Sequence, residues 1–198
     1  MADFTKLEKN LKERGYAVTV CATKEDAAAY LNTAVDGVSV AFGGSRTLDQ
    51  MGLYDLLKAH NHTVWHWKDG LDVLPEAMQT DVYISSVNAM AETGEMVNID
   101  GNGNRVAGTL FGHKKLYLVV GTNKLAENLD AAIWRARNVA GPIRAMQQGR
   151  KTPCVANNAD RCYDCKSPDR ICRGMVILMG PTMNMPTEVI LVNEELGC

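Results

Sequence analysis

The sequence contains no long apolar segment, and this absence limits where the protein can act. No apolar run among the 198 residues approaches the length needed to span a bilayer, and the charged start MADFTKLEKNLKERG lacks the apolar core of a secretory signal. A basic excess is also missing, because the formal net charge of −2 leaves nothing to neutralise a phosphate backbone. We therefore expect a cytoplasmic protein with neither a membrane nor a nucleic acid as partner.

Cysteine is scarce outside one short segment. Cys21 and Cys198 stand alone, and the other four of the six cysteines fall between residues 154 and 172. A chain of this size can bury a core without disulfides, and in a reducing cytosol clustered thiols serve more often as ligands or redox groups. We expect one domain over residues 1–198 that carries a cysteine-rich segment at 151–174.

The rest of the chain alternates between helical and strand patterns. Helical spacing or composition predicts helices at 4–13, 23–35, 46–59, 72–80 and 123–149, the last broken near Gly141-Pro142. Apolar and β-branched runs predict strands at 16–20, 37–42, 63–67, 81–90, 116–121, 174–180 and 187–193, and the segment 94–108 suggests an inserted β-hairpin with its turn at 100–103. Strands this apolar are typical of parallel sheets covered on both faces, so the predicted class is α/β.

Three loops follow predicted strands and are candidate ligand sites. They cover residues 43–45, 92–94 and 121–124. Open α/β sheets bind ligands at the carboxyl ends of their strands, so we expect the three loops to converge. The ligand-binding candidates in and beside them are Gly43, Gly44, Ser45, Arg46, Thr93, Gly94, Arg105, Gly121 and Lys124.

Two of these loops have alternative explanations. Glycines and a helix start at 43–45 suit a phosphate or carboxylate, but a tight turn capped by Ser45 or Thr47 explains them equally well. Glu92 is the catalytic candidate, as general base or nucleophile, with a local cap or ion pair as the alternative. His60, His62 and His66 have no recognised ligand spacing, so we interpret them as packing or solvated side chains.

The cysteine-rich segment has the spacing C-x7-C-x2-C-x6-C, formed by Cys154, Cys162, Cys165 and Cys172. One CxxC pair joined by two isolated cysteines is closer to iron–sulfur arrangements than to the paired CxxC motifs of zinc sites. A [4Fe–4S] cluster is the leading hypothesis, with zinc and metal-free thiols or disulfides as alternatives. Four nearby cations would offset the thiolate charge, or would form a solvated face: Arg161, Lys166, Arg170 and Arg173.

Four stretches carry a resemblance to a known family. They are GGSRTLDQMGL at 43–53, AETGEMVNIDGNGNRVAG at 91–108, LYLVVGTNKL at 116–125 and KTPC…CYDCKSPDRIC at 151–172. The chain resembles the lactate-utilisation protein family, the LUD domain, in a short cysteine-bearing branch. The GNR motif adds Asn104 to the ligand-binding candidates.

The resemblance implies a fold and a metabolic context. The fold is the Rossmann-like open sheet shared by glucosamine-6-phosphate deaminase, ribose-5-phosphate isomerase and CoA transferases, with helices on both faces. Some members act with iron–sulfur, flavin or oxidoreductase partners in converting L-lactate to pyruvate. The leading hypothesis is therefore an iron–sulfur-carrying redox or accessory subunit of organic-acid metabolism that binds a small anionic metabolite. The alternatives are a zinc-stabilised, non-catalytic binding or assembly module and a CoA-ester or sugar-phosphate enzyme that uses Glu92.

Overall fold

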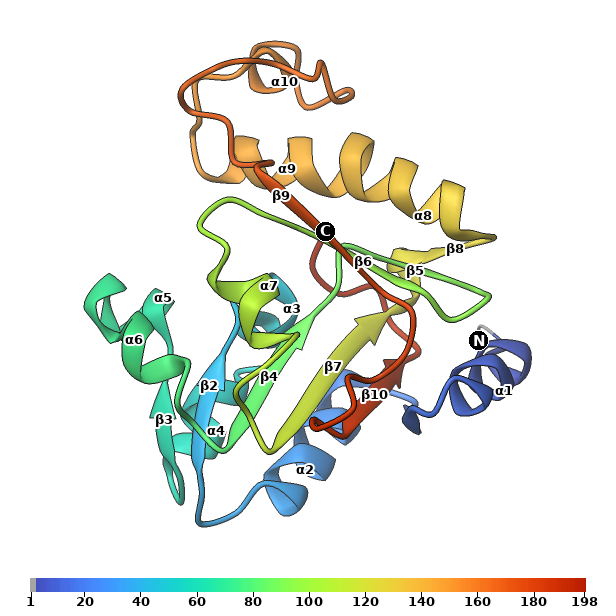
Figure 1. Cartoon of the computed structure of the whole chain (residues 1–198), viewed down its shortest axis with the longest axis vertical. Coiled ribbons are helices and arrows are strands. Elements are labelled where there is room, and N and C mark those ends of the chain that lie inside the picture. The colour runs from blue at the N-terminus through green and yellow to red at the C-terminus, as the bar shows by residue number, and fades with distance from the viewer. Residues whose placement is uncertain (1–2) are drawn as a thin grey trace.

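The structure, a computed structural model, describes residues 3–198 and has a six-stranded parallel sheet at its centre. The strand order is β1-β10-β7-β4-β2-β3, and every neighbouring pair is parallel (Figure 1). The strands are β1 (Ala17–Cys21), β2 (Ser39–Phe42), β3 (His62–Val64), β4 (Val82–Ser86), β7 (Lys115–Gly121) and β10 (Thr187–Val192). The predicted α/β class with an open sheet is confirmed.

Both faces of this sheet are covered because side chains alternate along each strand. On β7, Tyr117 and Val119 contribute to one core cluster, while Leu118 and Val120 contribute to the other. The first cluster includes side chains of α2 (Lys24–Ala34), α3 (Arg46–Gln50) and α4 (Leu53–Lys58). The second includes α1 (Thr5–Glu13) and α6 (Leu74–Ala77).

A second, four-stranded sheet lies beyond the carboxyl end of the first. It has the order β8-β5-β6-β9 and consists of β5 (Ala89–Ala91), β6 (Met96–Asp100), β8 (Leu125–Ala126) and β9 (Gly174–Leu178). The single strand expected over 81–90 is therefore two strands in two sheets, because the chain leaves the parallel sheet after Ser86 and pairs again from Ala89. This crossing brings the small sheet next to the carboxyl edge of the large one.

The prediction of a β-hairpin within 94–108 is wrong, because no return strand follows the turn predicted at 100–103. β6 ends at Asp100, and α7 (Asn104–Gly108) follows after three residues. The Asp100 carboxylate accepts hydrogen bonds from the backbone N–H groups of Gly101, Arg105 and Val106 at 2.7, 2.9 and 3.2 Å, which favours a helix start over a return strand. β6 has two antiparallel partners, β5, joined to it through the turn at 92–95, and β9.

The longest helical segment runs without the break expected at Gly141-Pro142. α8 (Leu129–Arg135) continues through the π-helical turn η3 (Ala136–Ala140) into α9 (Gly141–Gln147). A proline ring meets the carbonyl four residues earlier in an ordinary α-helix, and the wider π turn moves that carbonyl aside. The segment crosses the small sheet, where Ala132 and Ala136 pack against Ala89, Ala91 and Val97 (Figure 1).

The remaining short elements are α5 (His66–Asp69), η1 (Leu71–Val73), η2 (Thr122–Lys124) and α10 (Pro153–Ala156). The helix expected over 46–59 is divided into α3 and α4 by Gly52, whose φ of 61° is left-handed. Within residues 3–198, no helix is both long enough and apolar enough to cross a membrane.

A substitution at Gly108 tests how closely α7 packs against Tyr83. A Cβ at this position would lie 2.6 Å from Cζ of Tyr83, whose ring stacks on His113 with centroids 4.8 Å apart. We expect Gly108→Ala to lower the free energy of unfolding, measured by urea denaturation, by about 1–3 kcal/mol. The control is Gly174→Ala, where a Cβ would meet nothing within 4 Å; equal losses in the two variants would contradict the packing argument.

Candidate functional site

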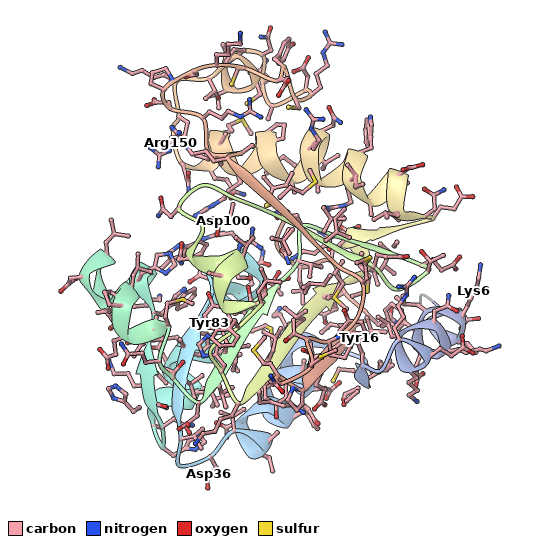
Figure 2. The ribbon with its side chains drawn as sticks, viewed as in Figure 1. Lys6, Tyr16, Asp36, Tyr83, Asp100 and Arg150 are labelled. Carbon is pink, nitrogen blue, oxygen red and sulfur yellow. The ribbon has the colours of Figure 1, made fainter. Side chains whose placement is uncertain are left out.

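A cavity of about 170 Å³ lies where the carboxyl ends of β2, β4 and β7 meet the small sheet and α9. Its wall includes Gly44 to Thr47 after β2, Ser86 to Asn88 after β4, and Lys124 after β7. Figure 2 shows two of its lining residues: Asp100 lies between the central sheet and the helical segment α8–α9, and Arg150 lies beside the end of that segment. The predicted location of a ligand site at the strand ends thus coincides with a cavity, which we name the basic cavity.

The basic cavity is strongly cationic. Its lining includes the cations Arg46, Arg105, Lys124, Arg144 and Arg150, and a single acidic side chain, Asp100. That carboxylate accepts three backbone N–H groups at the start of α7. In the described part of the chain, only Arg46 among the five cations forms an ion pair, with Asp49. Cys198 also lines the cavity and, like Asp100, offsets part of the positive charge, but cations remain in excess, which favours an anionic ligand.

Arg105 contributes to this charge from a buried position. Its Nη2 donates to Asn88 Oδ1 at 3.0 Å and to the carbonyl of Ile99 at 2.5 Å, and its Nη1 donates to Asn98 Oδ1 and, at 3.4 Å, to the carbonyl of Ser86. Most of its hydrogen-bonding capacity is therefore used within the protein. Arg105 acts on a ligand mainly through its charge and by fixing the wall.

Arg144 and Arg150 are the cations best placed for direct contact with a ligand. The guanidinium of Arg144 lies 4.5 Å above the ring of Trp67, which holds the side chain over the cavity, and its Nη1 makes one 3.3 Å hydrogen bond to Gln147. Arg150 is exposed and contacts Gln148 at 3.2 Å. Arg144 lies on α9 and Arg150 just after it. Neither residue directly follows a strand of the central sheet, so the sequence pattern does not mark them as part of the site.

Lys124 is the most perturbed cation of the wall. Its side chain is buried, and Nζ donates to Thr47 Oγ1 and to Ser86 Oγ, each at 2.7 Å. Burial lowers the pKa of Lys124 to about 7; the nearby Arg135 and Arg105 act in the same direction, and Cys198 opposes them. At neutral pH this amine therefore exists in both protonation states.

The structure brings together most, but not all, of the predicted ligand-binding residues. Those that line the basic cavity are Gly44, Ser45, Arg46, Asn104, Arg105 and Lys124. Gly43 and Gly121 lie behind the wall, where a Cβ would come within 2.5 Å of Ser85 Oγ and 2.7 Å of the Glu194 carbonyl, respectively. Ser45 also caps α3 by accepting the N–H of Leu48 at 3.4 Å, so the capped-turn explanation of this loop is confirmed, and its role in ligand binding stays a prediction.

Glu92, Thr93 and Gly94 are not brought to the cavity. They form the turn between β5 and β6, where the Glu92 carboxylate pairs with Lys6 at 2.6 Å and Thr93 accepts a hydrogen bond from Arg14 at its carbonyl. Lys6 lies on the opposite side of the molecule from Asp100 and Arg150 (Figure 2). The turn was assigned to the ligand site because 81–90 was expected to be one strand; the loop that follows β4 is instead Val87-Asn88.

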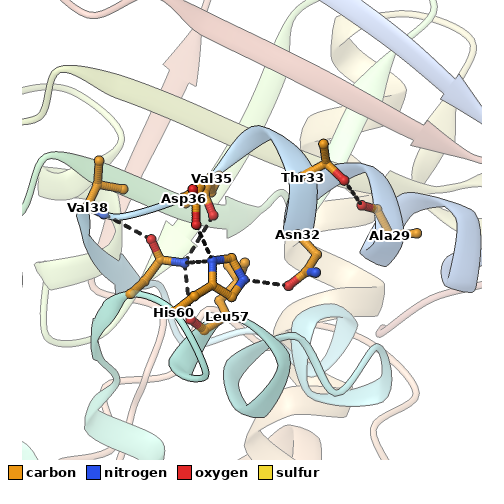
Figure 3. Close-up of polar contacts among 9 residues, drawn as sticks. Ala29, Asn32, Thr33, Val35, Asp36, Val38, Leu57 and His60 are labelled. Atoms are coloured by element: carbon orange, nitrogen blue, oxygen red, sulfur yellow. Dashed lines mark hydrogen bonds and ion pairs between the residues drawn. The ribbon is translucent and has the colours of Figure 1, made fainter.

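Of the three histidines at 60, 62 and 66, two form structural contacts and the third lines the basic cavity. His60 joins α2 to the segment before β3, with Nδ1 2.7 Å from Asp36 Oδ1 and Nε2 2.8 Å from Asn32 Oδ1 (Figure 3). His62 pairs with Glu76 at 2.6 Å. His66, which sequence analysis left out of the site, lines the basic cavity, and burial lowers its pKa.

The four clustered cysteines line a second and smaller cavity, which we name the cysteine cavity. Its wall contains Cys154, Cys162, Cys165 and Cys172, all half-buried, together with Arg137 and Arg170. The Asp164 N–H points to Cys162 Sγ at 3.4 Å, and Thr152 Oγ1 lies 3.2 Å from Cys154 Sγ. Of the four cations expected to offset thiolate charge, only Arg170 lines the cavity.

The backbone around the cysteines is unusual for the chain. Asn158, Ala159 and Asp164 are the non-glycine residues of the described chain with left-handed φ, at 56°, 57° and 44°. Such backbone conformations cost free energy, and they cluster at active sites and ligand-binding loops. Within residues 3–198, no group of three or more His, Cys, Asp or Glu side chains is arranged to hold a metal ion.

The basic cavity and the cysteine cavity share a wall. Ile171 and Cys172 line both of them. Gly141 makes the contact possible, since a Cβ there would lie 3.1 Å from Cys172 Sγ. The two candidate sites that sequence analysis treated separately are therefore neighbours.

Lys124 generates a pH-dependent stability prediction. In the unfolded chain its amine stays protonated to about pH 10.5, whereas in the folded chain it loses its proton near pH 7, so the unfolded state binds more protons in between. We expect the free energy of unfolding to rise from pH 7 to about 8.5 by on the order of 1–2 kcal/mol relative to Lys124→Met. Chemical denaturation at a series of pH values measures this, with the exposed Lys114→Met as control; parallel pH profiles for wild type and Lys124→Met would contradict it.

Comparisons with known proteins agree with this architecture. No curated protein gives a significant match. Among solved structures, a DUF162 family protein from Deinococcus radiodurans is similar over 94% of each chain, with a TM-score of 0.56 and 13% identity, which shows a shared fold. Ribose 5 phosphate isomerase A from Neisseria gonorrhoeae covers 54% of each chain, with a TM-score of 0.37 and 17% identity. The family model of the LUD domain matches residues 4–192, and the chain therefore belongs to the LUD domain family.

Proposed function

We propose that the chain is an iron–sulfur-carrying subunit of organic-acid metabolism that binds a small carboxylate in the basic cavity, beside a cluster held by the four cysteines. Membership of the LUD domain family supports a lactate-utilisation-like role. The observation that carries the finer proposal is the wall shared by the two cavities at Ile171 and Cys172. Through this wall, a ligand in one cavity lies next to a redox centre in the other.

The size and charge of the basic cavity support a small anionic ligand. A volume of about 170 Å³ is below the range of typical drug-sized sites and suits a metabolite of a few heavy atoms. Arg144 and Arg150 can donate to a carboxylate, and Asn102 and Asn104 on the opposite loop can contact neighbouring hydroxyl or carbonyl oxygens. Arg105 adds positive charge from a buried position, and Lys124 adds to it when its amine is protonated.

The chemistry of the cysteine cavity supports a cluster of several metal atoms. One CxxC pair joined by two isolated cysteines is closer to iron–sulfur arrangements than to the paired CxxC motifs of zinc sites, and all four cysteines line one cavity. In a [4Fe–4S] cluster each of the four cysteines binds a different iron, so the thiolates stand further apart than around one zinc ion. The N–H of Asp164 and the guanidinium groups of Arg137 and Arg170 would stabilise the negative sulfur atoms. A bound [4Fe–4S] cluster would supply one-electron transfer.

Metal analysis tests the cluster. We expect protein purified under anaerobic conditions to contain iron and sulfide in a fixed ratio to protein, with broad visible absorption, and Cys172→Ala to lose both. Cys21→Ala is the matched control, because Cys21 is buried in the central core and lines neither cavity. Zinc alone, in a redox-silent protein, would favour the structural binding module, and the absence of both metals would reject a metal site.

Ligand titration tests the basic cavity. We expect L-lactate or pyruvate to bind wild-type protein with a heat measurable by calorimetry, and Arg144→Gln to weaken binding at least about tenfold because a charge-assisted hydrogen bond is lost. Lys114→Gln, an exposed site outside the cavity, is the control and should leave affinity unchanged. Equal affinity in all three proteins would place the ligand elsewhere.

A further inference from the structure

Lys124 differs from the other cations of the basic cavity because its amine is held on two sides by hydroxyl groups. Its side chain is among the buried polar groups of the core, only 3% exposed, and it lines the cavity. Nζ lies 2.7 Å from both Thr47 Oγ1, on α3, and Ser86 Oγ, at the end of β4. Within residues 3–198 no carboxylate side chain pairs with it.

The directions of these hydrogen bonds are fixed by the neighbouring backbone. The Ser86 hydroxyl donates its proton to the carbonyl of Val119 at 2.5 Å, and the Thr47 hydroxyl donates its proton to the carbonyl of Leu196 at 3.3 Å. Each hydroxyl has one proton, so both oxygens can only accept from Nζ. Two N–H bonds of Lys124 are therefore committed to the protein.

One tetrahedral position of Nζ remains, and it holds either a third proton or the nitrogen lone pair. Burial favours the neutral amine, and the charges of Arg135 and Arg105 favour it further, while Cys198 acts against it. Asp100, the acidic side chain in the wall, is bound to backbone N–H groups. In the neutral amine the lone pair is the one feature not used inside the protein, which is the arrangement a nucleophile needs.

We propose that Lys124 is an imine-forming amine that acts on the carbonyl of a 2-oxo acid bound in the basic cavity, an inference that rests on the proposed carboxylate site. The carboxylate of the ligand binds Arg144 or Arg150, and its C2 carbonyl meets Nζ. A bond forms between Nζ and C2, the carbon–oxygen double bond breaks, and the carbonyl oxygen leaves as water with both protons of the neutral amine. The step needs no oxidant or reductant.

Reductive trapping tests this inference. We expect pyruvate, the smallest stable probe of the class, together with cyanoborohydride to add one carboxyethyl group per chain. Peptide mapping by mass spectrometry should find it on Lys124, at a rate at least about tenfold above that of exposed lysines such as Lys114, because the buried amine is far more often neutral at pH 7. The label should rise between pH 6 and pH 8, as the neutral amine becomes dominant.

The variants separate an imine from simple charge. Lys124→Arg keeps a cation and Lys124→Met keeps a similar length without one. Neither variant should carry the label at position 124, and Lys114→Arg should carry it on Lys124 at the wild-type rate. The second Lys124 variant keeps the test valid if the first does not fold. Pyruvate or lactate that binds wild-type protein by calorimetry without any label on Lys124 would overturn the imine and leave the carboxylate site standing. The absence of binding by either acid would overturn both.

Discussion

The buried guanidinium of Arg105 is the interaction on which the site depends. Its N–H groups reach the end of β4 at Ser86, the linking residue Asn88, and β6 at Asn98 and Ile99, so one side chain joins the central sheet to the small sheet. Removing a guanidinium from water is costly unless its donors are satisfied, and here carbonyl and amide oxygens satisfy them in place of carboxylates. The positive charge is therefore offset only in part, by the nearby Asp100 and Cys198. An anionic ligand would relieve it and would stabilise the corner between the two sheets by the same contacts that bind it.

The position of the cysteine cavity depends on the long helical segment. The π turn at 136–140 lets the helix continue through Pro142, and α9 then carries Arg144 over the carboxyl edge of the central sheet. Because Gly141 has no side chain, Cys172 can approach the same helix from the other side. The helical segment thus carries Arg144 into the wall of the basic cavity and also contacts the thiol of Cys172. This contact explains how Gly141 and Cys172, which are far apart in sequence, contribute to one wall.

The fold was largely predictable from the sequence, because apolar alternation and helical spacing are local signals. The second sheet was not, since the run 81–90 is equally apolar on both sides of the crossing at Val87-Asn88, and pattern alone cannot tell which sheet a strand joins. The turn at 100–103 was misread because an Asp-Gly and Asn-Gly sequence suits a hairpin, whereas the Asp100 side chain selects a helix start.

The residues of the candidate site were predictable only where a local sequence pattern marks them, and not where tertiary packing places them. Gly44, Ser45, Arg46 and Lys124 were predictable because they directly follow strands that end at one edge. His66, Arg144 and Arg150 come from helices and a loop whose docking is set by packing, so no short-range signal marks them. Glu92 has the residue type of a catalytic acid, but the early end of β4 moves it to the side of the molecule that carries α1.

The shared wall also has an energetic consequence for the proposed function. A carboxylate bound in the basic cavity would place negative charge close to Cys172, and electron uptake by a cluster in the cysteine cavity would add negative charge on the other side. The two charges would repel across the shared wall, whose residues Ile171 and Cys172 are half-buried, so the bound anion would make reduction of the cluster less favourable. Linkage requires the reciprocal effect: reduction of the cluster would weaken anion binding by the same factor. Two sites that share Ile171 and Cys172 would therefore couple electron arrival to ligand release without any movement of the fold.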